Sequence, residues 1–183
     1  MKPIEDLKAE HKGIVLILSV LEKISERIAA GESVPIDHLK QVLSFLQIFT
    51  NKCHHGKEEG LLFAAMEEAG VPKDGGPLGG MLSDHVKCRQ SIGEMKELLN
   101  SCEKGGPDSQ AALATAALQF VHMGKNHIWK ENIVLFPMAE KSVPADKLKS
   151  LGEQFERFKK EETDQGTYEA FHAMIEELAR IYL

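Results

Sequence analysis

The sequence predicts an all-α protein, an up-down-up-down four-helix bundle with a C-terminal helical extension. Long stretches are rich in Ala, Leu, Glu, Lys and Met, which favour helices, and aromatic residues make up only 6% of the chain. Clusters of glycine and proline divide these stretches into segments of helical length. A pattern of polar residues also recurs between the two halves of the predicted bundle.

The helix boundaries of the bundle follow from these breakers. Gly31 and Pro35 separate the first two helices, and turn clusters at 70–77 and 105–108 separate the others. Short connections of this kind favour antiparallel neighbours. The four helices are expected at about 4–30, 36–69, 78–102 and 109–141.

Two further helices are expected after the bundle. Pro144 and Gly166 bracket segments at about 145–163 and 168–182, which carry several aromatic residues and are expected to pack on the outside or end of the bundle. The length of 183 residues corresponds to roughly one domain. We therefore expect one domain with two parts, a bundle at 1–143 and an extension at 144–183.

Composition excludes several classes of function. The net charge of −6 argues against a nucleic-acid partner and against binding to an anionic membrane surface. No apolar run reaches the length of a membrane span, and the N-terminus lacks the apolar segment of a secretory signal. Three cysteines without a CxxC motif are read as reduced thiols, so a cytoplasmic location is expected.

Histidines and glutamates recur at matched positions in the two halves of the bundle. The first and third helices each carry one such histidine, and the second and fourth each carry a His-x-x-x-Glu motif. The two motifs lie 73 residues apart, and the two single histidines lie 74 apart. Two helical hairpins of one design, related by a pseudo-twofold axis, explain these spacings. The residues are His11, His54, Glu58, His85, His127 and Glu131.

Winding each helix at about 100° per residue predicts which of these side chains face the core. Four of the six fall within apolar arcs, whereas His54 falls at the margin of its arc and Glu58 a little beyond it. His55 and Glu59 lie about 100° further round and are expected to face solvent. Burying unpartnered carboxylates would cost several kcal/mol each, and placing them together adds repulsion. A pair of metal ions in the core removes both penalties.

The ligand types indicate which metal is expected. A histidine and a glutamate four residues apart lie one turn apart on one helix face, so the imidazole can bind one metal while the carboxylate leans towards a second. Nitrogen and carboxylate ligands suit iron or manganese. Zinc is less well suited, because thiolate ligands and an HExxH motif are both missing from the pattern. We expect two iron ions, bridged by carboxylates and by an oxo or hydroxo group, with manganese or zinc as less favoured alternatives.

The motifs Cys53-His54-His55-Gly56-Lys57-Glu58 and His127-Ile128-Trp129-Lys130-Glu131 resemble those of the hemerythrin-like family, the HHE cation-binding domains. The resemblance covers 4–141 and implies a four-helix bundle around a carboxylate-bridged non-haem di-iron centre. It implies that the six residues of the repeat are the metal ligands. Two features depart from the oxygen-carrying hemerythrins: Arg89 stands where they have a second third-helix histidine, and the last motif is HxxxE rather than HxxxxD. One fewer imidazole implies a more open site.

The expected function is binding of, or reaction with, dioxygen, peroxide or nitric oxide, in a binding, sensing or detoxifying role. Alternatives are a peroxidase-type enzyme, a donor that repairs iron centres, a regulatory module, or metal storage. No general base or nucleophile stands apart from the ligands, so the sequence does not support turnover of an organic substrate. Whether the chain is an enzyme is left open. The expected partner is a small diatomic ligand or peroxide, and a redox or protein partner stays undefined.

The remaining polar residues receive simpler interpretations. His38, His122 and His172 are expected at the surface. Cys53 and Cys88 lie beside proposed ligands and are read as small core residues. The candidates for contacts with the ligands themselves are Glu10, Lys57 and Asp84.

Overall fold

A computed structural model describes residues 2–106, 108–162 and 165–183. All regular secondary structure in these residues is helical, as the sequence predicts. No helix in the described chain is long and apolar enough to cross a membrane. The single-segment helices are α1 (Pro3–Ala29), α5 (Gly76–Glu103), α8 (Ala145–Glu162) and α9 (Gln165–Tyr182).

Two of the long helices of the bundle contain π-helical segments. The second rod of the bundle runs from residue 36 to residue 68 and the fourth from 109 to 142, without a break in either. The second consists of α2 (Ile36–Phe45), η1 (Leu46–His54), α3 (His55–Lys57), η2 (Glu58–Leu62) and α4 (Phe63–Glu68). The fourth consists of α6 (Ser109–Lys130), η3 (Glu131–Leu135) and α7 (Phe136–Ser142).

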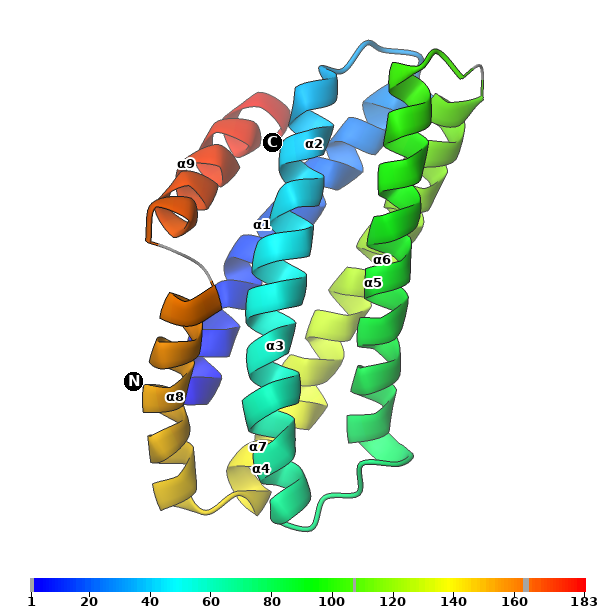
Figure 1. Cartoon of the computed structure of the whole chain (residues 1–183). Helices are drawn as coiled ribbons and strands as arrows, with labels where there is room; N and C mark the ends of the chain where they lie inside the picture. Colours follow the sequence, from blue (N-terminus) through cyan, green and yellow to red (C-terminus); the bar gives the residue numbers. More distant parts are fainter. Residues whose placement is uncertain (1, 107, 163–164) are drawn as a thin grey trace.

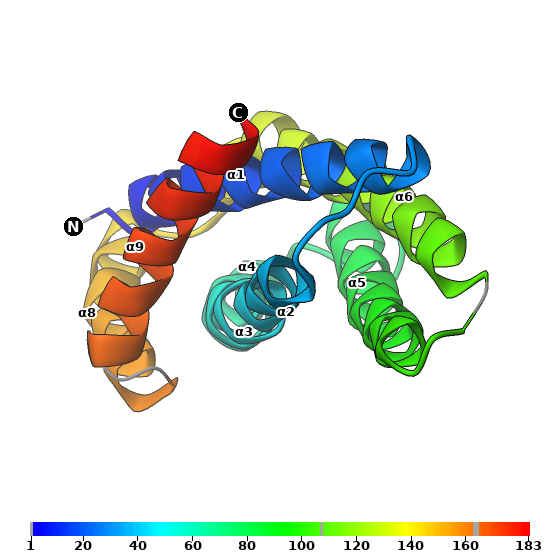
Figure 2. The same cartoon turned by 90° about the horizontal axis from the view of Figure 1, so that it is seen from above.

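The four rods alternate in direction, so the up-down-up-down bundle is confirmed (Figure 1). Seen along its length, α1 lies beside α6, and α5 packs between α6 and the rod that contains α2 (Figure 2). The observed boundaries agree with the predicted ones to within a few residues. The third helix begins earlier than expected, at Gly76, because Gly75 adopts a φ of 73° and Pro77 is tolerated in a first helical turn.

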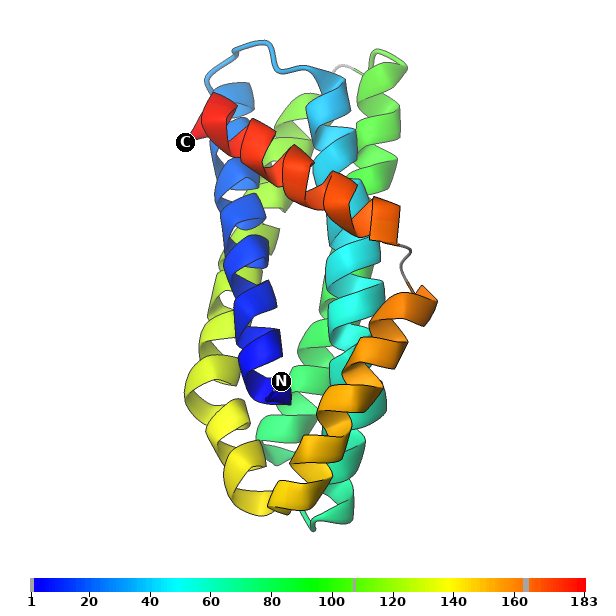
Figure 3. The ribbon, with the colours of Figure 1, turned by 90° about the vertical axis from the view of Figure 1, so that its left-hand side faces the viewer.

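The two C-terminal helices cover one side of the bundle. Helix α8 packs against α1 and the π-helical segments η1 and η2, and α9 crosses α1 and α2 diagonally (Figure 3). Gly166 lies inside α9 rather than before it, so the predicted start at residue 168 is three residues late. The predicted end of the preceding helix, residue 163, lies outside the described residues. His38 is half-buried rather than exposed, because its Nδ1 lies 2.7 Å from the Tyr182 hydroxyl of α9.

Two apolar clusters fill the bundle, one towards each end. One contains Leu18, Leu46 and Phe120, and the other contains Leu7, Leu62 and Phe136. The buried histidines and glutamates of the repeat occupy the layer between them. Apolar side chains therefore lie on both sides of this layer, and each buried polar atom in it needs a partner.

Candidate metal centre

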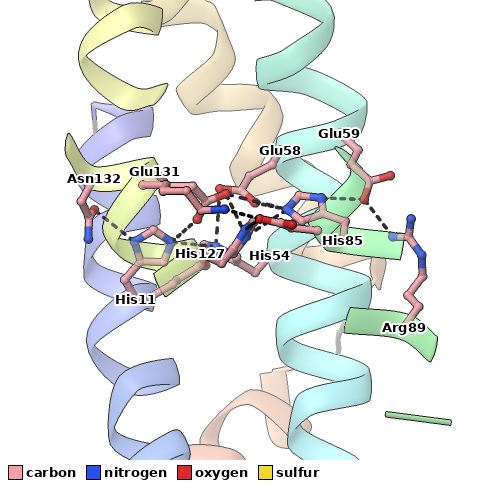
Figure 4. Close-up of polar contacts among 12 residues, drawn as sticks. His11, His54, Glu58, Glu59, His85, Arg89, His127, Glu131 and Asn132 are labelled. Atoms are coloured by element: carbon pink, nitrogen blue, oxygen red, sulfur yellow. Dashed lines mark hydrogen bonds and ion pairs between the residues drawn. The ribbon is translucent and has the colours of Figure 1, made fainter. Parts of the chain in front are cut away.

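Seven buried side chains in the layer between the two apolar clusters form two groups that could each hold a metal ion. Figure 4 shows contacts among His11, His54, Glu58, His85, His127 and Glu131. Within each group the ligand atoms lie within 4.8 Å of one another. The groups share Glu58, so the two positions are adjacent. The first group is His11, His54, Glu58 and Glu131; the second is His55, Glu58, His85 and His127.

The first group joins the first, second and fourth rods of the bundle. Nε2 of His11 lies 3.0 Å from Nε2 of His54 and 3.1 Å from Oε2 of Glu131. Oε1 of Glu58 lies 3.5 Å from Nε2 of His54. Two ligands bound at right angles, each about 2.1 Å from an ion, would be about 3.0 Å apart. These separations therefore suit neighbouring ligands of one ion.

The second group repeats this arrangement with α5. Nε2 of His85 lies 3.2 Å from Nε2 of His127 and 3.5 Å from Oε2 of Glu58. Oε1 of Glu131 lies 3.1 Å from Nε2 of His127 and 3.7 Å from Nε2 of His85. The ring of His55 stacks on that of His85 with centroids 3.8 Å apart. Each carboxylate thus has one oxygen facing each group.

The pseudo-twofold relation predicted from the spacings extends to the packing of the rings. Phe63 stacks on His85 with centroids 5.7 Å apart, and Phe136 stacks on His11 with centroids 5.4 Å apart. The two phenylalanines are 73 residues apart, as are the two glutamates. The phenylalanine five residues after the glutamate of each His-x-x-x-Glu motif therefore stacks on the single histidine of the other helical hairpin.

The surroundings of the two carboxylates show whether a pair of metal ions fits this layer. Glu58 and Glu131 are completely buried, and none of their four oxygens has a hydrogen bond of normal geometry. Leaving buried carboxylates unpaired costs several kcal/mol each. Facing imidazole nitrogens and carboxylate oxygens are the donors that iron and similar ions accept. The residues present therefore fit a pair of cations.

Protonation of the layer follows from its burial. Burial and the neighbouring charge of Glu131 raise the pKa of Glu58 well above its ordinary value. Burial also opposes ionisation of Glu131, but electrostatic attraction to His127 and the other imidazoles beside its oxygens holds its pKa well below the usual range. Burial lowers the pKa of His54 to about 4, and lowers that of His55 well below the usual range. Burial therefore favours the protonated carboxyl of Glu58 in the absence of metal, whereas bound cations would favour its ionised form.

The two single histidines of the repeat are oriented by residues outside the two metal groups. Nδ1 of His11 lies 3.1 Å from Oδ1 of Asn132, and Nδ1 of His85 lies 2.8 Å from Oε1 of Glu59. Arg89 donates a hydrogen bond of 2.8 Å to the same Glu59 oxygen. Protonation of Nδ1 leaves the Nε2 lone pair directed into the layer. Glu59, expected to face solvent, is half-buried and positions His85 instead.

A buried ionic network orients His54. Its Nδ1 lies 2.8 Å from Oε2 of Glu10, and the Lys57 ammonium donates to the other Glu10 oxygen. Lys57 also donates to Asp6, 3.3 Å away, and is almost fully buried. Burial favours the neutral carboxyl of Glu10, but His54 and Lys57 outweigh it and lower the pKa of Glu10 to about 2. Glu10 is therefore a charged acceptor that fixes the His54 tautomer.

His55 corrects the prediction from helical winding. It was expected to face solvent, but it is buried and belongs to the second group. The cause is the π-helical segment η1, in which the His55 amide donates to the Thr50 carbonyl five residues earlier. Each residue of a π-helix turns by less than 100°, so a constant winding angle misplaces the residues that follow. The one sequence feature that could have indicated His55 as a ligand is that it directly follows His54.

The structure also brings one more imidazole to the site than the four predicted from the sequence. Five histidines lie in the two groups, so the more open site inferred from Arg89 is not observed. His55, which lies on the second rod, supplies the third imidazole of the second group. Arg89, on the third helix, instead forms an ion pair with Glu59. His122 and His172 are exposed, as expected.

Asp84 and Cys88 lie on α5 beside the second group. Oδ2 of Asp84 is 3.7 Å from Nδ1 of His127 and accepts a hydrogen bond from Lys130. Burial raises the pKa of the Cys88 thiol to about 12. Cys88 is therefore a neutral, small side chain in the core, as the sequence indicates.

A small cavity adjoins the layer on the side of the Leu18 cluster. Its free volume is about 30 Å³. A volume of roughly 10–15 Å³ on the same measure admits one water molecule, so the space suits a ligand of a few atoms. His54, His55 and His127 are part of its lining. The rest is mainly apolar and includes Leu18, Leu46, Cys88, Phe120 and Ile128.

A four-helix bundle whose core holds grouped imidazoles and carboxylates defines a metal-binding helical protein. The profile of the Hemerythrin HHE cation binding domain matches residues 2–139. The chain therefore belongs to the hemerythrin HHE cation-binding domain family. No curated protein and no solved structure matches the chain significantly.

Proposed function

We propose that the chain is a non-haem di-iron protein that binds or reacts with dioxygen, peroxide or nitric oxide. His11 and His54 would hold one iron, and His55, His85 and His127 the other. Glu58 and Glu131 would bridge the two. The observation that carries this proposal is that both buried carboxylates direct one oxygen to each group of imidazoles and lack any other partner.

Iron in such a centre supplies electrons to a small oxidant or a coordination position to a small ligand. The chain contributes orientation and exclusion of water. Asn132, Glu10 and Glu59 hold three imidazoles with Nε2 directed inward. The apolar clusters on both sides keep the layer dry. The cavity beside His54, His55 and His127 supports access for a molecule of a few atoms rather than an extended organic substrate.

Metal storage has less support than a di-iron centre. Only the two groups that share Glu58 are found among the described residues as candidate ion sites, which limits the expected content to two ions. Enzymatic turnover of peroxide and repair of other iron centres both use the same ligands. Catalytic consumption of peroxide by the iron-loaded protein would favour the first of these alternatives.

Metal analysis of protein purified without added metal tests the proposal. We expect two iron ions per chain and, after exposure to air, an absorption band in the near ultraviolet typical of bridged ferric pairs. Glu131→Ala and His127→Ala should lower the iron content and the thermal stability together, because the surviving ligands stay buried without a partner. Unchanged iron content in both variants would contradict the ligand assignment.

A further inference from the structure

Among the described residues, Thr50 is a buried helical threonine whose hydroxyl has no hydrogen-bond partner. Ser19, Ser25 and Thr115 each donate to the carbonyl four residues earlier, over 2.7–3.0 Å. This is the usual arrangement for serine and threonine inside helices. Thr50 is buried, yet its Oγ1 forms no hydrogen bond.

The π-helical segment explains why Thr50 lacks this bond. Thr50 lies within η1, where backbone pairing spans five residues instead of four. The carbonyl that a helical threonine ordinarily uses is therefore displaced. An unpartnered buried hydroxyl is unfavourable, so its presence calls for a partner that the polypeptide does not supply.

Thr50 lies in the wall of the small cavity beside the metal groups. His54 and His55 follow it by four and five residues and line the same cavity. The lining also includes apolar side chains of α1 and α6, such as Leu18 and Phe120. Asp84 is the charged residue of the lining, and Lys130 neutralises it. Thr50 is thus a polar donor at a mainly apolar cavity of about 30 Å³.

We propose that the Thr50 hydroxyl donates a hydrogen bond to the small ligand that this centre binds. The proposal rests on the proposed function and adds a position and a class of ligand to it. The ligand is an uncharged diatomic molecule with an acceptor atom, such as dioxygen or nitric oxide. A volume of about 30 Å³ suits a molecule of a few atoms, and the mainly apolar lining favours an uncharged one.

Nitric oxide bound to the reduced, iron-loaded protein tests the proposal. Thr50→Val keeps the shape of the side chain and removes the donor, whereas Thr50→Ser keeps the donor. We expect nitric oxide to dissociate about three to ten times faster from Thr50→Val, the range expected for loss of one neutral hydrogen bond. The N–O stretching frequency should rise, because a hydrogen bond to the ligand weakens the N–O bond. Thr50→Ser should restore both values towards those of the unmodified protein.

Thr115→Val is the matched control, because it removes a hydroxyl that has a partner, is exposed and is not part of the cavity lining. It should leave both nitric oxide readouts unchanged. In the metal-free protein, Thr50→Val should not lower the unfolding temperature, since no hydrogen bond is lost. A clear fall in that temperature would show a structural hydrogen bond and overturn the proposal.

Iron content separates failure of this proposal from failure of the proposed function. Two irons per chain with identical dissociation rates and stretching frequencies in the unmodified protein, Thr50→Val and Thr50→Ser would overturn the role of Thr50 alone. A protein that takes up no iron would overturn both.

Discussion

The carboxylate of Glu10 accepts a hydrogen bond of 2.8 Å from Nδ1 of His54, and the partner of its second oxygen is the buried ammonium of Lys57. This contact connects the first metal group to an ionic network that ends at Asp6. The charge on Glu10 fixes which His54 nitrogen carries the proton. It also raises the basicity of the nitrogen that faces the centre.

We expect Glu10→Gln to weaken iron binding by roughly 10–100-fold, the usual range for loss of a contact that orients a metal-bound histidine. Stability should also fall by roughly 3 kcal/mol, because Lys57 stays buried with only Asp6 as a charged partner. Iron titration against a competing chelator and thermal unfolding measure the two effects.

Glu5→Gln is the control for this variant. Glu5 lies on the same helix, is exposed, and forms only a 3.8 Å ion pair with Lys8. Its replacement should change neither iron affinity nor stability appreciably. Equal iron affinities of Glu10→Gln and Glu5→Gln would show that Glu10 does not act on the centre.

His55→Ile should reduce the iron content from two ions per chain towards one. Isoleucine is chosen because Ile128, 73 residues later, is buried at the matching place in the repeat. The second group would keep His85 and His127 but lose its third imidazole. Metal analysis checks the count, and His122→Ala should retain two irons because His122 is exposed. Full iron content in His55→Ile would remove His55 from the ligands.

Two glycines in helices should respond oppositely to replacement by alanine. A Cβ atom at Gly93 would have no atom within 4 Å, so Gly93→Ala should stabilise the protein by about 0.5–1 kcal/mol. At Gly56 it would lie 2.7 Å from Cζ of Phe158, which packs from α8. Gly56→Ala should therefore destabilise by about 1–3 kcal/mol. Thermal unfolding compares them, and equal stabilisation by both would show that α8 does not pack tightly there.

Cys88 should make stability fall at alkaline pH. Burial raises its pKa from 9.0 to about 12, so the unfolded chain loses the thiol proton at lower pH than the folded protein. The stabilisation is present below pH 9 and declines between pH 9 and about pH 12. Relative to Cys88→Ala, the unmodified protein should lose up to about 1.4 kcal/mol per pH unit in this window.

Alkylation by iodoacetamide gives an independent check on Cys88. At pH 9 the half-buried Cys102 should react much faster than the buried Cys88 in the native protein. Equal alkylation of Cys88 and Cys102 would contradict a buried, neutral Cys88 thiol. So would a stability difference between the unmodified protein and Cys88→Ala that does not change with pH.

The helices of the bundle were predictable because their signals are local. Pro35, Gly75 and Gly105 lie at breaks in the helical pattern, and apolar periodicity marks the segments between them. The side chains of the repeat were predictable as a set, since the same spacing occurs twice. His55 was not, because its position depends on the winding of the π-helical segment before it. The contacts of Asn132 and Glu59 were not, because they join residues 121 and 26 positions apart.

Residue order along the chain was sufficient to establish an all-helical bundle with histidines and glutamates in its interior. Periodicity and helix breakers act over a few residues, so no knowledge of packing is needed to read them. The tertiary structure decided which imidazoles form each group, that Glu58 belongs to both, and that Thr50 lines a cavity without a partner. These features arise from local helix winding and from contacts between rods such as that of His11 with His54, 43 residues apart, which the linear pattern does not encode.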